Sequence, residues 1–340
     1  MRIALCGAGL VGRRHAAAIR ACEGAALAAI TDPDPAARVF AEGLGVPYHA
    51  ELAELLADPP DAIVLATPNA HHFEGAMACI AAGVPVLVEK PLVTDVDEGR
   101  RLVEAAEAAG VPLLAGHHRR HNPRIAAAKR AVDQGKLGRI VSAQTTTWLT
   151  KPDDYFDVVW RREEGAGPVR VNLVHDVDLL RHLIGDVVEV FAFSQSGRGH
   201  AVEDAAVATL LFASGALGTV SVSDAIAAPV SWELTAREDP AFPPTDGAYA
   251  WIGGTHGSLE LPSAALWSYP DARDWKTPIG KTFPTVDIVD PLVRQIENFV
   301  AVARGEADPV VSGMDGLKAV AIVEAVQRSA RTGRVERPEV

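Results

Sequence analysis

The segment "GAGLVG" at residues 7–12 constrains the fold more than any other part of this chain. It directly follows the apolar run "RIALCG" of residues 2–7 and opens the helical spacing of residues 10–22. In a strand–turn–helix of this kind, Gly7 allows the tight turn, Gly9 lets a pyrophosphate approach the backbone, and Gly12 permits close helix–strand packing. We therefore predict a dinucleotide-binding turn; a purely structural glycine turn is the alternative.

The start of the following helix belongs to the same predicted site. A helix N-terminus offers backbone N–H donors to phosphate groups, so Leu10 and Val11 join the three glycines in the predicted cofactor-binding set. Any phosphate must be held locally in this way, because the formal net charge of the chain is −12. The same charge argues against nucleic acid or an anionic membrane as a partner.

The first part of the chain alternates short apolar runs with longer amphipathic ones. Such alternation predicts a parallel, doubly wound α/β sheet of the Rossmann type. The predicted strands are residues 2–7, 25–31, 61–67, 84–90 and 111–116, and the predicted helices are residues 10–22, 36–43, 70–82 and 95–110.

From about residue 137 the pattern changes to successive β-rich runs separated by Gly, Ser or Asp turns. It predicts an α+β domain with an open, mainly antiparallel sheet, one face of which is wet or covered by a partner. At 340 residues the chain suits two domains, which we place at residues 1–120 (dinucleotide-binding) and 121–340 (substrate-binding and oligomerisation). The predicted strands are residues 139–149, 187–197, 205–213, 216–225 and 230–238, followed by helices at 290–305 and 313–333.

The cysteine count and the hydropathy indicate the cellular compartment in which we expect the protein. Cys6, Cys22 and Cys79 are odd in number and match no disulfide or metal spacing, which indicates a reduced compartment. No segment is long and apolar enough to span a membrane. We therefore expect a cytoplasmic protein with no membrane partner.

Asp32 ends the second predicted strand, twenty residues after Gly12. A carboxylate at this place accepts hydrogen bonds from the adenosine ribose and repels a 2′-phosphate, so it favours NAD over NADP. Arg38 lies close by in the sequence and leaves NADP possible. A capping role in the "DPDP" turn is the alternative.

The ends of two further strands carry polar residues, and ligands of open α/β sheets bind at such ends. Glu89 and Lys90 follow one strand, and a lysine over a cofactor can steer or share a proton; a solvated lysine at a strand end is the alternative. The other strand adds Thr67, Pro68, Asn69 and His72 to the predicted cofactor-binding set. His71, His72, His117, His118 and His121 have no carboxylate or cysteine at ligand spacing, so we predict no metal site.

Segments spread along the whole chain resemble the glucose–fructose oxidoreductase, inositol dehydrogenase and MocA (Gfo/Idh/MocA) family of NAD(P)-dependent oxidoreductases. The resemblance implies a Rossmann domain followed by an open antiparallel sheet whose back face mediates dimers or tetramers. It also implies that Lys90 belongs to the catalytic set and that His175 occupies the proton-transfer position. The segments are "GAGLVGRRHA" (7–16), "ATPNAHH" (66–72), "EKPL" (89–92), "GHHRRHNP" (116–123), "WRREEGAGPVRVNLVHDVDLL" (160–180) and "SARTG" (329–333).

The helix predicted around His175 raises a choice between a structural and a catalytic histidine. An apolar stripe of Leu173, Val177, Leu180 and Ile184 should face the core, and His175 would then lie about 200° around the helix from Leu173. Imidazole titrates near neutrality, which suits reversible proton exchange. We therefore predict a catalytic His175, with Asp178 or Asn172 orienting its ring.

One position departs from the resemblance. Many dehydrogenases of the family have an aspartate four residues before the histidine, where this chain has Val171. On an α-helix Asn172 would lie about 60° from His175 and could share its face. An asparagine can orient a substrate hydroxyl but cannot take a proton, so we place Asn172 in the catalytic set in an orienting role.

These observations predict an NAD-dependent oxidoreductase that interconverts a secondary alcohol and a ketone on a sugar, inositol or related cyclic polyol. His175 would exchange the hydroxyl proton and Lys90 would steady the oxygen. Two alternatives remain: an NAD-dependent glycosidase on the same fold and a non-catalytic NAD(P)-binding sensor. We expect a homodimer or homotetramer formed through the C-terminal sheet. The predicted substrate-binding residues, several of which could equally be packing residues, are Lys90, Arg120, Trp148, Tyr155, Trp160, Arg161, Asn172 and His175.

Overall fold

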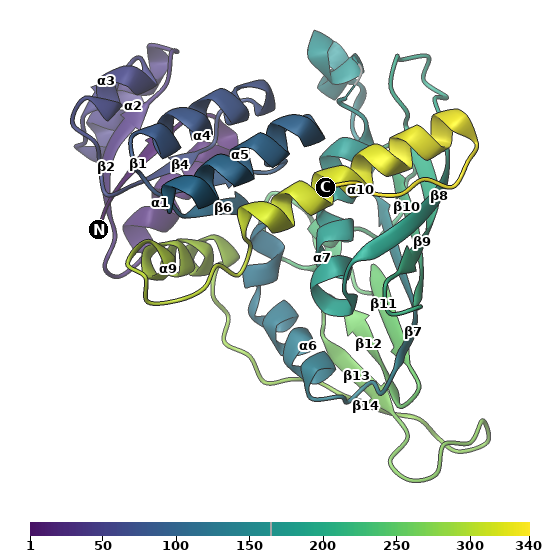
Figure 1. Ribbon diagram of the computed structural model, residues 1–340. Coiled ribbons are helices and arrows are strands. Elements are labelled where there is room, and N and C mark those ends of the chain that lie inside the picture. The colour runs from purple at the N-terminus through teal and green to yellow at the C-terminus, as the bar shows by residue number, and fades with distance from the viewer. Residues whose placement is uncertain (164) are drawn as a thin grey trace. The chain divides into compact units, whose positions relative to one another are not determined.

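The computed structural model describes residues 1–163 and 165–340 (Figure 1). The chain forms two compact units. The first unit combines Met1–Asn122 with the later segment Val289–Val320 and the last residue, and the second combines Pro123–Ile288 with Ala321–Glu339. The predicted division at residue 120 takes no account of this return of the chain to the first unit.

The first unit is built on a six-stranded sheet in which every neighbouring pair is parallel. The spatial order is β3-β2-β1-β4-β5-β6. Successive strands are thus added on one side of β1 up to β3 and then, from β4 onward, on its other side. This is the Rossmann-type sheet that the alternating pattern predicted. The strands are β1 (Arg2–Cys6), β2 (Ala26–Thr31), β3 (Tyr48–His49), β4 (Ala62–Leu65), β5 (Val86–Glu89) and β6 (Leu113–Gly116).

Helices cover both faces of this sheet. Alternate residues of a strand point to opposite faces, and here both sets are apolar. Val64 and Leu87 belong to one buried apolar cluster, which includes Ile19, whereas Ile63 and Val88 belong to another. Both faces are therefore apolar and covered, which explains why the strands read as continuous hydrophobic runs. The helices are α1 (Leu10–Ala21), α2 (Ala36–Leu44), α3 (Leu52–Leu56), α4 (His72–Ala81) and α5 (Val96–Ala109).

Helix α9 (Pro291–Ala303) and the first residues of α10 (Gly313–Thr332) also belong to the first unit. The side chain of Asp290 caps α9 by accepting from the Leu292 amide at 2.8 Å. Ile296 and Phe299 are fully buried in the same cluster as Ile19. The apolar side of α9 thus completes the core beneath α1.

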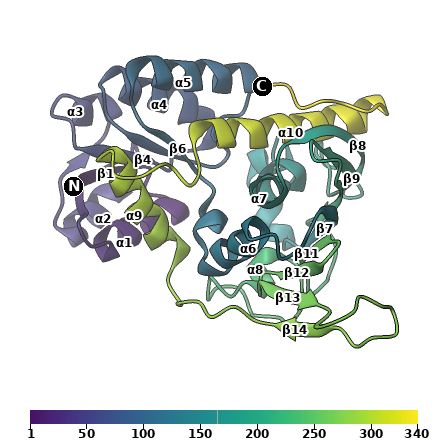
Figure 2. The ribbon, with the colours of Figure 1, turned by 60° about the horizontal axis from the view of Figure 1, so that its bottom comes forward.

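The second unit contains an eight-stranded sheet of order β14-β13-β12-β11-β7-β10-β9-β8 (Figure 2). Only the β7–β10 pair is parallel, so the sheet is mainly antiparallel, as predicted. The strands are β7 (Ile140–Trp148), β8 (Val187–Gln195), β9 (Ala205–Phe212), β10 (Leu217–Ser223), β11 (Ala250–Gly254), β12 (Gly257–Leu261), β13 (Ala265–Ser268) and β14 (Gly280–Thr282).

The strand predicted at residues 230–238 is wrong. A short helix, α8 (Trp232–Thr235), occupies its centre. The Ser231 hydroxyl accepts from the Leu234 amide at 3.3 Å, which is an N-cap contact. The alternating apolar pattern was misleading because a capping serine started a helical turn within it.

Helices α6 (Pro123–Asp133) and α7 (Val174–Ile184) complete the second unit with the sheet. Along β9, Ala206, Ala208 and Leu210 are buried while Val207 is half-exposed, so one face of the sheet is covered and the other is open. Figure 1 shows α7 alongside this sheet. Within the described residues, no helix combines the length and the apolar character needed to cross a membrane.

Candidate active site

Two of the three glycines in the turn between β1 and α1 are sterically required, and the third is not. Gly7 has φ +93°, and a Cβ there would lie 2.3 Å from the Ala66 carbonyl oxygen. A Cβ on Gly12 would lie 1.9 Å from the Gly7 carbonyl oxygen. A Cβ on Gly9 would meet nothing within 4 Å. The fold itself therefore requires Gly7 and Gly12, whereas Gly9 borders open space of the kind that a pyrophosphate needs.

The first turn of α1 is open at its N-terminus. Its N-cap residue, Gly9, has no side chain to satisfy the leading amides, and Leu10 is 83% exposed. Amide N–H groups at such an end attract anions through hydrogen bonding and the helix dipole. Together with the space beside Gly9, this end fits the phosphates of a dinucleotide.

Asp32 connects the end of β2 to the glycine turn. One carboxylate oxygen accepts from the Ala8 amide at 2.6 Å, and the other accepts from the Asp34 amide at 2.8 Å. The side chain is half-buried. Each carboxylate oxygen has a second lone pair, so Asp32 can hold the turn and still accept from ribose hydroxyls.

The predicted cofactor residues after β4 fall into two groups. Thr67 is half-buried, and Pro68 and Asn69 are exposed at the start of a short 3₁₀ turn. His72, by contrast, is fully buried. Its Nδ1 lies 2.8 Å from the Pro91 carbonyl oxygen and its Nε2 lies 2.9 Å from the Thr67 carbonyl oxygen.

The expectation that His72 binds the cofactor is corrected by these contacts. Both ring nitrogens are occupied by backbone carbonyls, so His72 braces two loops instead of presenting a nitrogen to a ligand. Burial lowers the pKa of His72, although the two carbonyls act in the opposite direction. A neutral imidazole has a single N–H. His72 therefore donates a hydrogen bond to either the Pro91 carbonyl or the Thr67 carbonyl at any one time.

Glu89, the last residue of β5, is also turned inward. One of its carboxylate oxygens lies 2.6 Å from Nε2 of the fully buried His15, and the other accepts from the Lys90 amide at 3.0 Å. Burial acts to raise the pKa of Glu89, but the hydrogen bond and the charge of His15 outweigh it and bring the pKa to about 2. Glu89 is therefore an internal link and not the cofactor ligand that its strand-end position suggested.

The backbone around His175 differs from the predicted α-helix. Residues Val169–Leu173 form a π-helical segment, and α7 begins at Val174. The α-helical geometry from which the angle between Asn172 and His175 was predicted therefore does not extend through Asn172, because π-helical turns hold more residues. Short π-helical insertions are frequent at functional sites.

Helix α7 is buried on all sides through its first two turns. Every residue from Val174 to Arg181 is buried, and His175 is only 6% exposed. Leu173, Val177 and Leu180 are buried as predicted, but the residues between them are buried too, so the apolar residues do not form a separate stripe. Asp176 accepts from the Thr147 hydroxyl of β7 at 2.7 Å, which fixes the start of the helix against the sheet. Asp178 is buried as well, and its role in orienting His175 stays a prediction.

Two family profiles match this chain, each over a different range of residues. Residues 1–117 match the family profile described as "Oxidoreductase family, NAD-binding Rossmann fold", and residues 125–260 match the profile of the GFO/IDH/MocA C-terminal domain. The chain belongs to the GFO/IDH/MocA oxidoreductase family. The predicted family, fold class and NAD-binding domain are thereby confirmed.

Members of the family with known names match nearly the full chain. Inositol 2-dehydrogenase 4 of Saccharopolyspora erythraea is 30% identical over 99% of this chain and 97% of its own length. D-apiose dehydrogenase of Paraburkholderia graminis is 29% identical over 97% of this chain and 88% of its own length. The WlbA dehydrogenase from Bordetella pertussis, solved in complex with NADH and UDP-GlcNAcA, is similar in structure with a TM-score of 0.80, 28% identity and coverage of 100% and 99% of the two chains.

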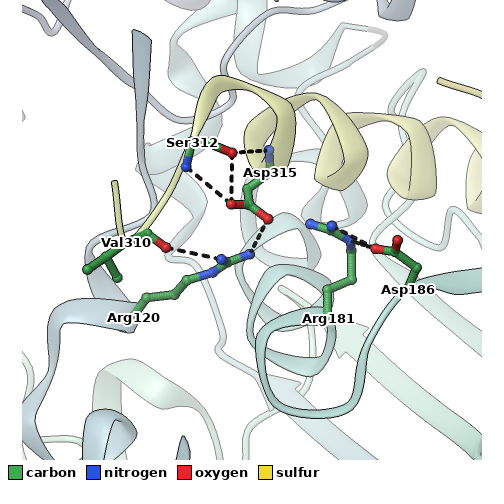
Figure 3. A network of polar contacts seen from close by, with 6 residues as sticks. All are labelled: Arg120, Arg181, Asp186, Val310, Ser312 and Asp315. Carbon is green, nitrogen blue, oxygen red and sulfur yellow. Dashed lines mark hydrogen bonds and ion pairs between the residues drawn. The ribbon is translucent and has the colours of Figure 1, made fainter. Parts of the chain in front are cut away.

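Arg120 was predicted to line the substrate pocket of this oxidoreductase. It is buried, and its guanidinium donates to the Val310 carbonyl and to Asp315, each at 3.3 Å (Figure 3). Asp315 also accepts from the Ser312 hydroxyl at 2.9 Å at the start of α10. The structure therefore gives Arg120 a role in holding the segment before α10, and we leave it out of the proposed substrate set.

The other predicted substrate residues of the second unit have different surroundings. The Trp148 indole N–H donates to the Ser221 hydroxyl at 2.9 Å. The Arg161 guanidinium carbon lies 4.1 Å from the Tyr155 ring centroid. Asn172 is half-buried in the π-helical segment. The side chain of Trp160 lies outside the described part of the chain.

The sequence did not reveal two buried polar contacts near the predicted site residues, one made by His15 and one made by Lys151. His15 was quoted in a motif but given no role, because its partner Glu89 is far away in the sequence. Lys151 was also missed: it pairs with the buried Asp224 at 3.3 Å, and its ammonium lies 4.9 Å from the Tyr155 ring centroid. Burial lowers the pKa of Lys151 while Asp224 raises it. No local pattern marks either group, since each depends on a tertiary contact.

Among the described residues, no cluster of three His, Cys, Asp or Glu side chains could hold a metal ion.

Proposed function

We propose that this protein uses NAD to interconvert a secondary alcohol and a ketone on a sugar, an inositol or a related cyclic polyol. The observation that carries the proposal is the glycine turn, where Gly9 faces open space beside an uncapped helix start. The relatives named inositol 2-dehydrogenase and D-apiose dehydrogenase support a polyhydroxylated substrate.

In the proposed mechanism, NAD when bound supplies the hydride acceptor for the oxidation. Gly7, Gly9, Leu10, Val11 and Gly12 hold its pyrophosphate, and Asp32 accepts from its ribose. Thr67, Pro68 and Asn69 complete the proposed binding set at the end of β4.

The acid–base chemistry is proposed for His175, Lys90 and Asn172. His175 takes the proton of the substrate hydroxyl as the ketone forms. Lys90, half-buried directly after β5, donates to the same oxygen, and a fixed donor is effective where water is largely excluded. Asn172 orients a substrate hydroxyl. Lys90, Tyr155, Trp160, Arg161, Asn172 and His175 form the proposed substrate-binding set. Trp148 is left out, because its strand neighbour Thr147 points toward α7 and Trp148 therefore points to the opposite, open face of the sheet, where it contacts Ser221.

A panel of sugars, inositols and cyclic diols, each offered with NAD and with NADP, tests this proposal. Formation of reduced cofactor with at least one polyol supports it. Sugar release without net reduction would instead identify the glycosidase, and NAD binding without turnover on any substrate would identify the sensor.

Asp32→Ser is expected to weaken NAD binding by about 10–100-fold, since a hydrogen bond to a charged acceptor contributes about 1.5–3 kcal/mol. It should also improve NADP binding relative to NAD, because the charge that repels the 2′-phosphate is gone. Titration of both cofactors by calorimetry measures the change. Asp34→Ser is the matched control, because exposed Asp34 accepts from the Ala36 amide at the start of α2 and a serine hydroxyl can accept from the same amide. A wild-type protein that prefers NADP would contradict the assignment.

We further propose that the open face of the second unit's sheet forms a homodimer or homotetramer, and that the protein is cytoplasmic. Phe193 of β8 is 60% exposed and Val207 of β9 is 51% exposed. Both line a groove whose apolar side chains an isolated subunit would expose to solvent. The three cysteines are buried free thiols, which suits a reducing compartment.

Phe193→Glu is expected to shift this assembly toward smaller species at micromolar concentration, because a charge would be buried in an apolar contact. Sedimentation velocity measures the effect. Glu107→Gln, at an exposed position of α5 and not on this sheet, is the control and should leave the assembly unchanged. A wild-type protein that sediments strictly as a monomer would refute the interface.

A further inference from the structure

We propose that His15 is a positioning residue that holds Lys90 in place through the buried carboxylate of Glu89. The inference rests on the proposed function, in which Lys90 contacts the reacting oxygen. It assigns a role to a histidine that lies within the dinucleotide-binding helix and not beside Lys90 in the sequence.

The first link is the contact between His15 and Glu89. His15 lies on the buried side of α1 and has no exposed surface. Its Nε2 is 2.6 Å from a Glu89 carboxylate oxygen. An ionised carboxylate only accepts hydrogen bonds, so Nε2 is the donor. A charge-assisted contact of this length is among the stronger hydrogen bonds in proteins.

The second link fixes the carboxylate against the sheet. Gly116 of β6 pairs with Glu89 of β5. A Cβ at residue 116 would lie 2.9 Å from the Glu89 Cα and 3.1 Å from its carboxyl carbon and one oxygen. The glutamate side chain therefore fills the space above the glycine, where it has little freedom to move without losing His15.

The third link reaches Lys90 itself. The second carboxylate oxygen of Glu89 accepts from the Lys90 backbone amide at 3.0 Å. The backbone orientation at Lys90 is thus tied to the Glu89 side chain, and that side chain is tied to α1. The helix that begins at the cofactor turn and the backbone that carries the lysine share one hydrogen-bonded chain.

The residue on the other side of Lys90 is held by a second buried imidazole. The Pro91 carbonyl oxygen lies 2.8 Å from Nδ1 of His72, whose Nε2 contacts the Thr67 carbonyl. Lys90 therefore sits between two anchored residues, while its own side chain remains half-buried. Rigid support on both sides is what an oriented donor needs, since misplacement by about 1 Å can cost about 100-fold in rate.

Electrostatics make the His15 contact necessary. Burial alone raises the pKa of a carboxyl group, and the contact with His15 is the largest of the effects that bring the pKa of Glu89 down to about 2; the charges of Lys90 and His118 add to it. A buried carboxylate without its donor must either take up a proton or turn toward water. Turning toward water removes the fixed acceptor from the Lys90 amide, and protonation weakens it, because a neutral carboxyl oxygen accepts less strongly than a carboxylate oxygen.

The test compares His15→Phe, which keeps the ring volume but removes the donor, with His15→Gln, whose amide nitrogen can take the place of Nε2. Ile19→Val, on the same buried side of α1, is the packing control. The readouts are hydrogen exchange of the Lys90 amide by NMR, NAD affinity by calorimetry, and kcat and KM on the best polyol found.

In His15→Phe, the Lys90 amide should exchange faster by on the order of tenfold, and kcat should fall by about 10–100-fold. KM and NAD affinity should stay within about threefold of wild type, since these residues do not touch either ligand in the proposed site. His15→Gln should restore both the exchange rate and most of kcat. Ile19→Val should change neither, whatever it does to the melting temperature.

Unchanged exchange of the Lys90 amide in His15→Phe would overturn the proposal, as would equal losses of kcat in His15→Phe and Ile19→Val. Failure of the proposed function looks different: the wild type would then form no reduced cofactor with any polyol. In that case the amide exchange alone would still support or overturn the positioning of Lys90 by His15.

Discussion

His175→Ala is expected to lower kcat by about 10²–10⁴-fold, the range for removal of a general acid or base. The affinity for NAD should stay nearly unchanged, because His175 acts on the substrate hydroxyl in the proposed mechanism. Steady-state kinetics with the best polyol and calorimetry with NAD measure the two quantities. Because His175 is buried in α7, the melting temperature must be recorded alongside.

The control for this variant is His182→Gln, a half-buried histidine in the last turns of the same helix. It should change kcat by less than about threefold, as surface substitutions generally have small effects. If His175→Ala turns over its true substrate at a near-normal rate, His175 is a structural histidine. A fall in kcat that external imidazole partly restores would further support proton transfer.

Lys90→Met is expected to lower kcat by about 10²–10³-fold, which is the typical loss when one donor to a developing oxyanion is removed. Methionine keeps much of the length and flexibility of the side chain while removing its charge and its donors. The change should fall on kcat more than on NAD affinity, and stopped-flow measurement of hydride transfer would show it directly.

Lys129→Met serves as the comparison for Lys90→Met. Lys129 lies on α6, where it pairs with Asp133 one turn away, so its loss should leave turnover within about twofold of wild type. Equal turnover by Lys90→Met and wild type would remove Lys90 from the catalytic set and, with it, the reason for positioning it.

Much of the first unit could be predicted because its signals are local. The glycine turn combines three residues within one hexapeptide, and each has a steric reason that the structure bears out at Gly7 and Gly12. Strands β1, β4 and β5 are apolar on both faces, so their runs are distinct from the amphipathic helices between them. The short strand β3 was missed because two residues carry no periodicity.

The site was harder to predict because its support is tertiary. His15 and Glu89 are 74 residues apart, and no spacing rule connects them. Glu89 and His72 stood at strand ends where cofactor ligands are common, yet both turn inward to satisfy buried polar groups. The contacts of Arg120 were not predicted for the same reason, since its partners Val310 and Asp315 lie almost 200 residues further along.

Local irregularity explains the remaining errors. The π-helical segment Val169–Leu173 changes which residues share a face with His175. A hydrophobicity pattern read at the α-helical period cannot reveal such a change. Similarly, the cap formed by Ser231 turned a strand-like run into α8.

The late return of α9 to the first unit bears on how this protein is made. Ile296 and Phe299 belong to the same buried cluster as Ile19 and Ile30, but a ribosome synthesises them only after all of Pro123–Ile288. At about 5–20 residues per second, the nascent Rossmann sheet waits on the order of ten seconds or more for α9. During that interval the apolar surface beneath α1 is available to chaperones, and to the same surface on neighbouring nascent chains.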